Sequence, residues 1–221
     1  MNKERIRQEI KRTAKACLLS VLLLPSLFHF GVLLGQQTDF LSRLNLNSIA
    51  ILPPFGPNAP SAARTMSVDL FASKFKLRNA ATKIVTADET TSLLQSKSAM
   101  SDYSIFVTTL SQTGIVNADS LKKVAQATGA DAVLLIEVLN YQEEKGSWWY
   151  GKGGKNVSRI QYALFRSDGN KIWETLEFRQ HDSKVSTNPY PMEHVLGDVT
   201  DKAITSLLAG TQHTDVRKKT E

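Results

Sequence analysis

A nearly uninterrupted apolar run over residues 131–139 is the feature that most restricts what this chain can fold into. Only Asp131, at its start, and Glu137 are polar, and such a run is typical of a β-strand that is covered on both faces. Just before the run, Asn117 is placed to cap a helix and Gly129 to end that helix in a left-handed turn. A helix that leads directly into a doubly covered strand indicates the α/β class.

The hydrophobic patterns on either side of this unit predict the other elements. We expect strands over residues 48–52, 83–86, 157–165 and 171–179, and helices over residues 61–77, 88–94, 101–112 and 191–209. Ser61 and Asp88 are the expected N-caps of the first two of these helices. The pair Asp168-Gly169 predicts a hairpin between the last two strands. The predicted fold is therefore α/β, a small mixed β-sheet with helices packed on its faces.

The amino-terminal segment has the composition of a membrane-targeting sequence. Residues 1–15 carry six basic and two acidic side chains, a charge of +6 − 2 = +4, which leaves only +2 for the remaining 206 residues. Residues 16–35 carry no formal charge, and about 20 helical residues are enough to span a bilayer. Basic residues on the amino side favour a cytoplasmic amino terminus. We therefore expect residues 1–35 to be a transmembrane signal anchor.

Two other interpretations of the amino-terminal segment stay open. It could be a cleaved signal peptide, although cutting after Gly31 or Gly35 would place His29 or Leu33 where the peptidase prefers a small residue. It could also be a buried helix of a soluble protein. If the segment is a signal anchor or a signal peptide, the rest of the chain faces the periplasm. It then consists of a linker (36–47), an α/β domain (48–210) and a flexible tail (211–221).

Three local patterns resemble motifs of one family of bacterial envelope proteins. They are the strand Ile49-Ala50-Ile51-Leu52-Pro53-Pro54-Phe55, the helix-to-strand passage Thr128-Gly129-Ala130-Asp131-Ala132-Val133-Leu134, and the hairpin Asp168-Gly169-Asn170-Lys171-Ile172-Trp173. The family includes the curli-secretion lipoprotein CsgG, the TolB amino-terminal domain, the polysaccharide lipoprotein PelC and the lipoprotein LpoB, which activates a penicillin-binding protein. The resemblance covers about residues 48–208. This chain departs from the family in having Ile136 where a glycine is usual and in lacking a lipobox.

The resemblance implies a mixed sheet with helices on its faces and a non-enzymatic role in envelope assembly, export or regulation. It also implies action through protein–protein binding, often as an oligomer. The partner would be another envelope protein or a second copy of this chain. Nucleic acid is not an expected partner, because the basic excess lies beside the apolar segment and not on the folded part.

The sequence shows no motif for catalysis, for a metal or for a cofactor. A Gly-x-Ser-x-Gly motif is absent, and none of the four histidines (His29, His181, His194 and His213) lies in a His-x-x-x-His spacing. The only cysteine, Cys17, excludes a multi-cysteine site and an intramolecular disulfide. We therefore predict no catalytic residue, no metal ligand and no cofactor. A periplasmic hydrolase without a recognisable motif stays open as the alternative function.

Three polar positions stand out in the sequence, and each has a simple structural explanation. Glu137 interrupts an apolar strand, and we expect it to face solvent or a sheet edge, with a buried ionic contact or a subunit interface as the alternative. We expect His181 and Asp182 to form a surface pair at a strand end, and His194 to lie on the solvated side of the last helix.

The loop over residues 145–155 is the predicted functional site. It places three consecutive aromatic residues, Trp148, Trp149 and Tyr150, between glycines and lysines that include Lys152 and Lys155. Exposed aromatic residues are favoured at protein interfaces and at the level of lipid headgroups, where lysines add attraction. We expect these five residues to contact a partner subunit or a membrane surface. The alternative is that a tryptophan folds back onto the sheet and is structural.

Overall fold

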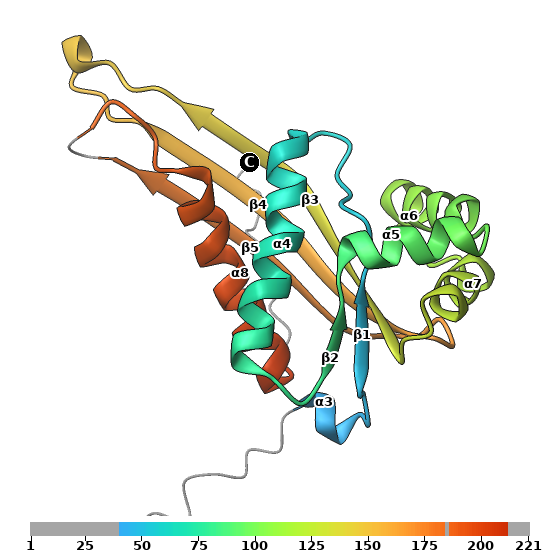
Figure 1. Cartoon of the computed structure of the whole chain (residues 1–221). Helices are drawn as coiled ribbons and strands as arrows, with labels where there is room; N and C mark the ends of the chain where they lie inside the picture. The colour runs from blue at the N-terminus through green and yellow to red at the C-terminus, as the bar shows by residue number, and fades with distance from the viewer. Residues whose placement is uncertain (1–39, 184–185, 212–221) are drawn as a thin grey trace, which may run out of the picture. The chain divides into compact units, whose positions relative to one another are not determined.

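The computed structural model describes residues 40–183 and 186–211, which form a five-stranded mixed sheet with helices on both of its faces (Figure 1). The helices of this part are α3 (Phe40–Arg43), α4 (Ser61–Arg78), α5 (Ala87–Ser96), α6 (Met100–Thr113), α7 (Ala118–Thr128) and α8 (Met192–Ala209). The strands are β1 (Ser48–Ile51), β2 (Lys83–Val85), β3 (Ala132–Glu144), β4 (Lys155–Arg166) and β5 (Lys171–Asp182). The α/β class and the mixed sheet predicted from the sequence are confirmed.

The sheet has two parts that meet at β3. The strand order is β2-β1-β3-β4-β5, with β1 parallel to both β2 and β3, and with β3, β4 and β5 antiparallel. The short parallel strands reach only one end of the long ones. The antiparallel ribbon therefore continues past them, and its far end carries the loop between β3 and β4 (Figure 1, upper left).

The core is split by the sheet into two hydrophobic layers. On one face α4 and α8 pack side by side over Leu134, Ile136 and Tyr162; on the other, α5, α6 and α7 cover Val133 and Leu135. Alternate residues of β3 point into opposite layers because side chains of a strand alternate between faces. The prediction of a strand covered on both faces is confirmed.

The predicted capping residues are correct for one helix and wrong for two. Asn117 caps α7 through its side chain, which accepts a hydrogen bond from the Ser120 amide, and Gly129 ends that helix with a φ of 67°. Pro60 is the N-cap residue of α4, so Ser61 is already helical and caps nothing. The N-cap of α5 is Thr86, not Asp88, because Thr86 and Glu89 exchange hydrogen bonds as a capping box.

The described part of the chain includes one α-helix that the sequence pattern did not predict. The expected linker 36–47 contains α3, whose Leu41 is fully buried. In the described part of the chain, no helix is long and apolar enough to cross a membrane. The signal-anchor prediction for residues 1–35 and the tail beyond residue 211 lie outside the described residues.

Candidate functional site

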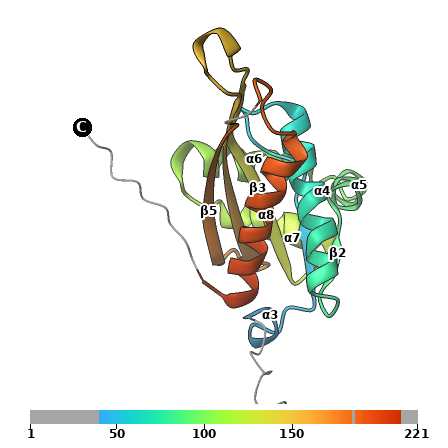
Figure 2. The ribbon, with the colours of Figure 1, turned by 90° about the vertical axis from the view of Figure 1, so that its left-hand side faces the viewer.

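The loop between β3 and β4 presents the three predicted aromatic side chains to solvent. Trp148, Trp149 and Tyr150 form a single 3-10 turn and are 68%, 77% and 88% exposed. The two tryptophan rings lie against each other, with centroids 4.0 Å apart. Figure 2 shows this loop, in gold at the top, projecting past the ends of α4 and α8. Neither tryptophan folds back onto the sheet.

The tip of the loop is closed by its own backbone. The amide of Ser147 donates to the Lys152 carbonyl (2.7 Å), and the amide of Lys152 donates to the Ser147 carbonyl (2.9 Å). Gly151 completes the turn in the left-handed region, at a φ of 60°. Since the backbone is already fixed, little conformational entropy would be lost when the aromatic rings bind a partner.

The base of the loop is tied to the segment that follows β5. Gly146 donates to the Thr187 carbonyl (2.7 Å), Gly154 donates to the Ser186 carbonyl (2.9 Å), and Ser183 donates to the Gly154 carbonyl (2.7 Å). This packing requires the glycines, because a Cβ on Gly153 would lie 1.5 Å from the Ser183 carbonyl oxygen. Hydrogen bonds between the β3–β4 loop and the segment after β5 therefore support the aromatic tip.

The two predicted lysines, unlike the three aromatic residues, lie next to acidic side chains. Lys152 is exposed and lies 3.7 Å from Glu144, which is also exposed, so this ion pair contributes at most about 1 kcal/mol. Lys155 is half-buried at the first position of β4, where its register partners are Glu144 and Asp182. Both lysines thus have acidic residues as neighbours.

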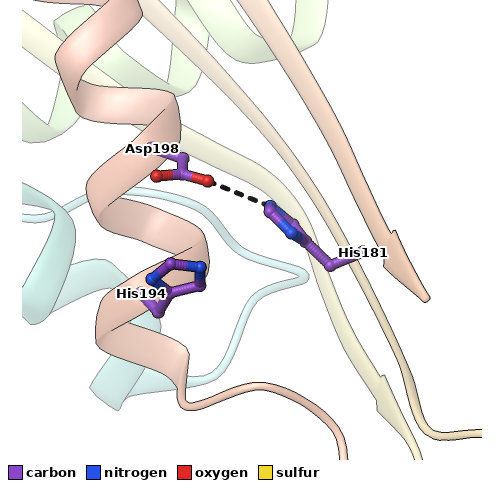
Figure 3. Close-up of side chains that lie close together, drawn as sticks. All are labelled: His181, His194 and Asp198. Atoms are coloured by element: carbon purple, nitrogen blue, oxygen red, sulfur yellow. Dashed lines mark ion pairs between the residues drawn. The ribbon is translucent and has the colours of Figure 1, made fainter. Parts of the chain in front are cut away.

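A cluster of polar aromatic residues lies beside the same end of the sheet, and the sequence analysis did not find it. His181 of β5 and His194 and Asp198 of α8 each offer one side-chain nitrogen or oxygen atom, and these three atoms lie within 4.8 Å of one another (Figure 3). The His181 Nε2 and Asp198 Oδ2 atoms are 3.4 Å apart. The Tyr190 ring packs on both imidazoles, at centroid distances of 5.6 and 5.5 Å.

The simple interpretations of the two histidines are partly correct. His194 is exposed on α8 as expected. The His181 Nε2 atom lies 3.4 Å from the Asp198 carboxylate on α8, so the acidic neighbour of His181 is Asp198 and not the adjacent Asp182. The sequence held one local signal of this arrangement, the i, i+4 spacing of His194 and Asp198 on a helix, but the third member is contributed by a different element.

Glu137 is buried, so the expectation that it faces solvent is wrong. Its exposed fraction is 6%, and its Oε1 accepts a hydrogen bond from the Ser111 hydroxyl (3.2 Å) at the end of α6. Burial raises the pKa of the Glu137 carboxyl, and the Ser111 hydrogen bond lowers it by less. The carboxyl lines a pocket of about 460 Å³, together with Gln161, Lys171 and Glu174.

No protein-family model and no curated protein matches this chain. Among solved structures, the chain is similar to the lipoprotein GNA1162 from Neisseria meningitidis, at 18% identity over 72% of this chain and 96% of that chain, with a TM-score of 0.42. It is similar to the PelC dodecamer from Paraburkholderia phytofirmans, at 13% identity over 76% and 89%, with a TM-score of 0.40. The LpoB C-terminal domain from Salmonella enterica matches at 14% identity over 62% and 84%, with a TM-score of 0.38.

PelC and LpoB also belong to the family that the sequence motifs resemble. The likeness to their structures is one of fold only. At these TM-scores it carries no argument about function, which must come from the residues of this chain.

Proposed function

We propose that this chain is a non-enzymatic assembly, export or regulatory protein of the bacterial cell envelope, and that residues 147–152 are the surface through which it binds a protein partner. The observation that carries the proposal is the exposure of three consecutive aromatic residues on a turn with a fixed backbone. Large aromatic side chains of this kind dominate the binding energy of protein interfaces.

The charges around the tip favour a protein partner over an anionic membrane surface. Residues 143–155 carry Lys145, Lys152 and Lys155 but also Glu143 and Glu144, a sum of +3 − 2 = +1, and Asp182 is the register partner of Lys155. Each lysine near an anionic surface contributes about 1 kcal/mol, and the acidic neighbours offset most of that attraction. A nearly neutral aromatic surface suits a protein interface better.

The cellular location belongs to the same proposal. An uncharged stretch of 20 residues with basic residues before it supports anchoring in the inner membrane, or export across it, with the α/β domain in the periplasm. The three sequence motifs described above support a role in the secretion, polysaccharide or cell-wall machinery. The partner is then another envelope protein or a second copy of this chain.

Photocrosslinking in living cells tests the proposed contact. A photoreactive residue replaces Trp148 in the full-length chain, and a matched control replaces Ile115, which is 66% exposed in the α6–α7 connection. We expect a discrete protein adduct from position 148 and not from position 115, with the partner identified by mass spectrometry. Lipid adducts alone, or no adduct from a folded and exported chain, would overturn the proposal.

A second experiment separates binding from folding. The probe is moved to Tyr150 in a chain that also carries Trp148→Ala and Trp149→Ala. Because both tryptophans are exposed, we expect unchanged thermal stability and a loss of the adduct. Retention of the adduct at full yield would show that the tryptophans do not contribute to the contact.

A hydrolase is the second candidate function, and one observation favours it. Two carboxyl groups, Glu137 and Glu174, line the same pocket, and the raised pKa of Glu137 suits a general acid. Glu174, however, is held by the Lys171 ammonium (2.6 Å) and by the Gln161 amide, so a substrate would have to compete with these two groups for the carboxylate. Loss of an envelope-linked activity in Glu137→Gln, with the Trp148 adduct intact, would favour the hydrolase.

A further inference from the structure

The geometry of His181, His194 and Asp198 points to a binding site for a divalent transition-metal ion, with Zn²⁺ as the ion that best fits the ligands. The three side chains come from two elements that the fold brings together, the end of β5 and the first two turns of α8 (Figure 3). Their candidate ligand atoms all lie within 4.8 Å of one another. This inference goes beyond the proposed function and does not depend on it.

The distances are close to those of a coordinated ion. Zn–N and Zn–O bonds of about 2.0–2.2 Å in a tetrahedral site separate the ligand atoms by about 3.3–3.5 Å. The His181 Nε2 and Asp198 Oδ2 atoms already have a separation of 3.4 Å. The ligand atom of His194 lies within 4.8 Å of the other two, and an exposed side chain on a helix surface can shorten such separations by changing rotamer.

The state of His181 is a second observation that supports a ligand. Its side chain is 19% exposed, and its Nε2 atom is buried without a hydrogen-bond partner among the described residues. The His181 Nε2 and Asp198 Oδ2 atoms are therefore close, at 3.4 Å, but do not have the geometry of a hydrogen bond. A buried polar atom without a partner is unfavourable, and an ion placed between His181 and Asp198 would satisfy both.

The composition of the cluster selects the class of ion. Two imidazoles and one carboxylate form a typical ligand set for Zn²⁺, and imidazole also suits Cu²⁺ and Ni²⁺. Ca²⁺ requires six to eight oxygen ligands and Mg²⁺ an octahedral shell rich in oxygen, which one carboxylate does not provide. Three protein ligands leave a fourth place for a water molecule.

The surroundings allow an ion to enter. A pocket of about 420 Å³ is lined by His194 and Asp198 and also by Lys74. The Lys74 ammonium is paired with Asp201 at 2.7 Å, so its positive charge is partly compensated and does not exclude a cation from the neighbouring carboxylate.

Bound metal would connect the end of β5 to the start of α8 across the segment that supports the aromatic loop. That segment includes Thr187, which accepts the hydrogen bond from Gly146. The ion would therefore stabilise the base of the loop as well as the helix. Binding only to the folded chain also raises the apparent stability of the fold.

Calorimetric titration of the full-length, chelator-treated protein with Zn²⁺ at neutral pH tests the site. We expect one ion per chain and a higher melting temperature with Zn²⁺ than without it, and neither effect with Ca²⁺ or Mg²⁺. His194→Ala and Asp198→Asn should each weaken Zn²⁺ binding by at least about tenfold. His194 is exposed, so its removal should leave the melting temperature of the metal-free chain unchanged.

The matched control is Asp182→Asn, which removes an exposed carboxylate next to His181 that is not part of the cluster and should leave Zn²⁺ binding unchanged. A visible Co²⁺ spectrum of tetrahedral type, lost in His194→Ala, would support the assigned ligands. Equal Zn²⁺ affinity in the parent chain, His194→Ala and Asp198→Asn would overturn the site, because the ion would then be bound elsewhere. Absence of Zn²⁺ binding to the folded parent chain would overturn it as well.

Discussion

Asn156 and Tyr190 hold each other through a pair of hydrogen bonds. The Tyr190 amide donates to Asn156 Oδ1 (2.8 Å), and Asn156 Nδ2 donates to the Tyr190 carbonyl (3.2 Å). Asn156 is fully buried at the second position of β4. The Asn156 side chain thus pairs with the backbone of Tyr190 in the way that a neighbouring strand would. Tyr190 belongs to the segment before α8, which contacts both the aromatic loop and the histidine cluster.

Replacing Asn156 with alanine should therefore destabilise the protein. Two backbone groups of Tyr190 lose their partner at a part-buried position, which costs about 1–3 kcal/mol in the free energy of unfolding. Urea denaturation measures the change, and the exposed Asn58 provides the control, because Asn58→Ala should change stability by less than about 0.5 kcal/mol. Equal stabilities of the two variants would show that the Asn156 hydrogen bonds contribute nothing.

Two glycines of the aromatic loop should be sensitive to alanine for different physical reasons, with Gly153 the more sensitive of the two. A Cβ on Gly153 would lie 1.5 Å from the Ser183 carbonyl oxygen, so the backbones must separate, at about 1–3 kcal/mol. Gly151 has nothing within 4 Å of an added Cβ, and its φ of 60° alone costs about 1 kcal/mol.

Urea denaturation of Gly153→Ala and Gly151→Ala measures this difference. Hydrogen exchange provides a second readout, because separation of the two backbones should expose the amides of Gly154 and Ser183. Faster exchange of these amides in Gly151→Ala than in Gly153→Ala would contradict the packing described here.

The helix caps show what the sequence could and could not predict about the fold. Asn117 and Gly129 were recognised because they stand at both ends of a clear apolar stripe. For α5, the capping residue Thr86 was missed although Thr86 and Glu89 have the spacing of a capping box. A residue type indicates that a cap is possible, but the backbone conformation decides which of several neighbours forms it.

The caps also provide a prediction. Asn117→Ala should destabilise the protein by about 1 kcal/mol, because the Ser120 amide loses its acceptor. Ser61→Ala is the control, since Ser61 lies inside α4 and makes no capping hydrogen bond. Thermal denaturation of both variants measures the effect, and a larger loss for Ser61→Ala would contradict the cap assignment.

The aromatic loop could be predicted from the sequence, and the histidine cluster could not. Trp148, Trp149 and Tyr150 are consecutive, so a single loop could be recognised before its structure was known. His181 and His194 lie on different elements and meet only because α8 packs back along β5. Local spacing in the sequence does not contain that information. The burial of Glu137 could not be predicted for the same reason, because the residue that contacts its carboxyl, Ser111, lies on α6.

Glu137 gives a prediction for the dependence of stability on pH. Burial raises the pKa of the folded carboxyl above that of the unfolded chain, which is about 4.3. The protonated form is therefore the one that the fold favours. Its contribution to stability is fully present below the unfolded pKa and is lost as the pH rises through the folded pKa.

Glu137→Gln keeps the shape of the side chain and removes the charge, so it should stabilise the protein at neutral pH by about 1 kcal/mol. The advantage should shrink as the pH falls toward about 4.3, where the parent carboxyl is itself protonated. Urea denaturation across this range measures the difference, with the exposed Glu144→Gln as a control that should change stability by less than about 0.5 kcal/mol. A Glu137→Gln variant that is less stable than the parent at neutral pH would mean that the ionised carboxylate stabilises the fold, and the desolvation argument would then be wrong.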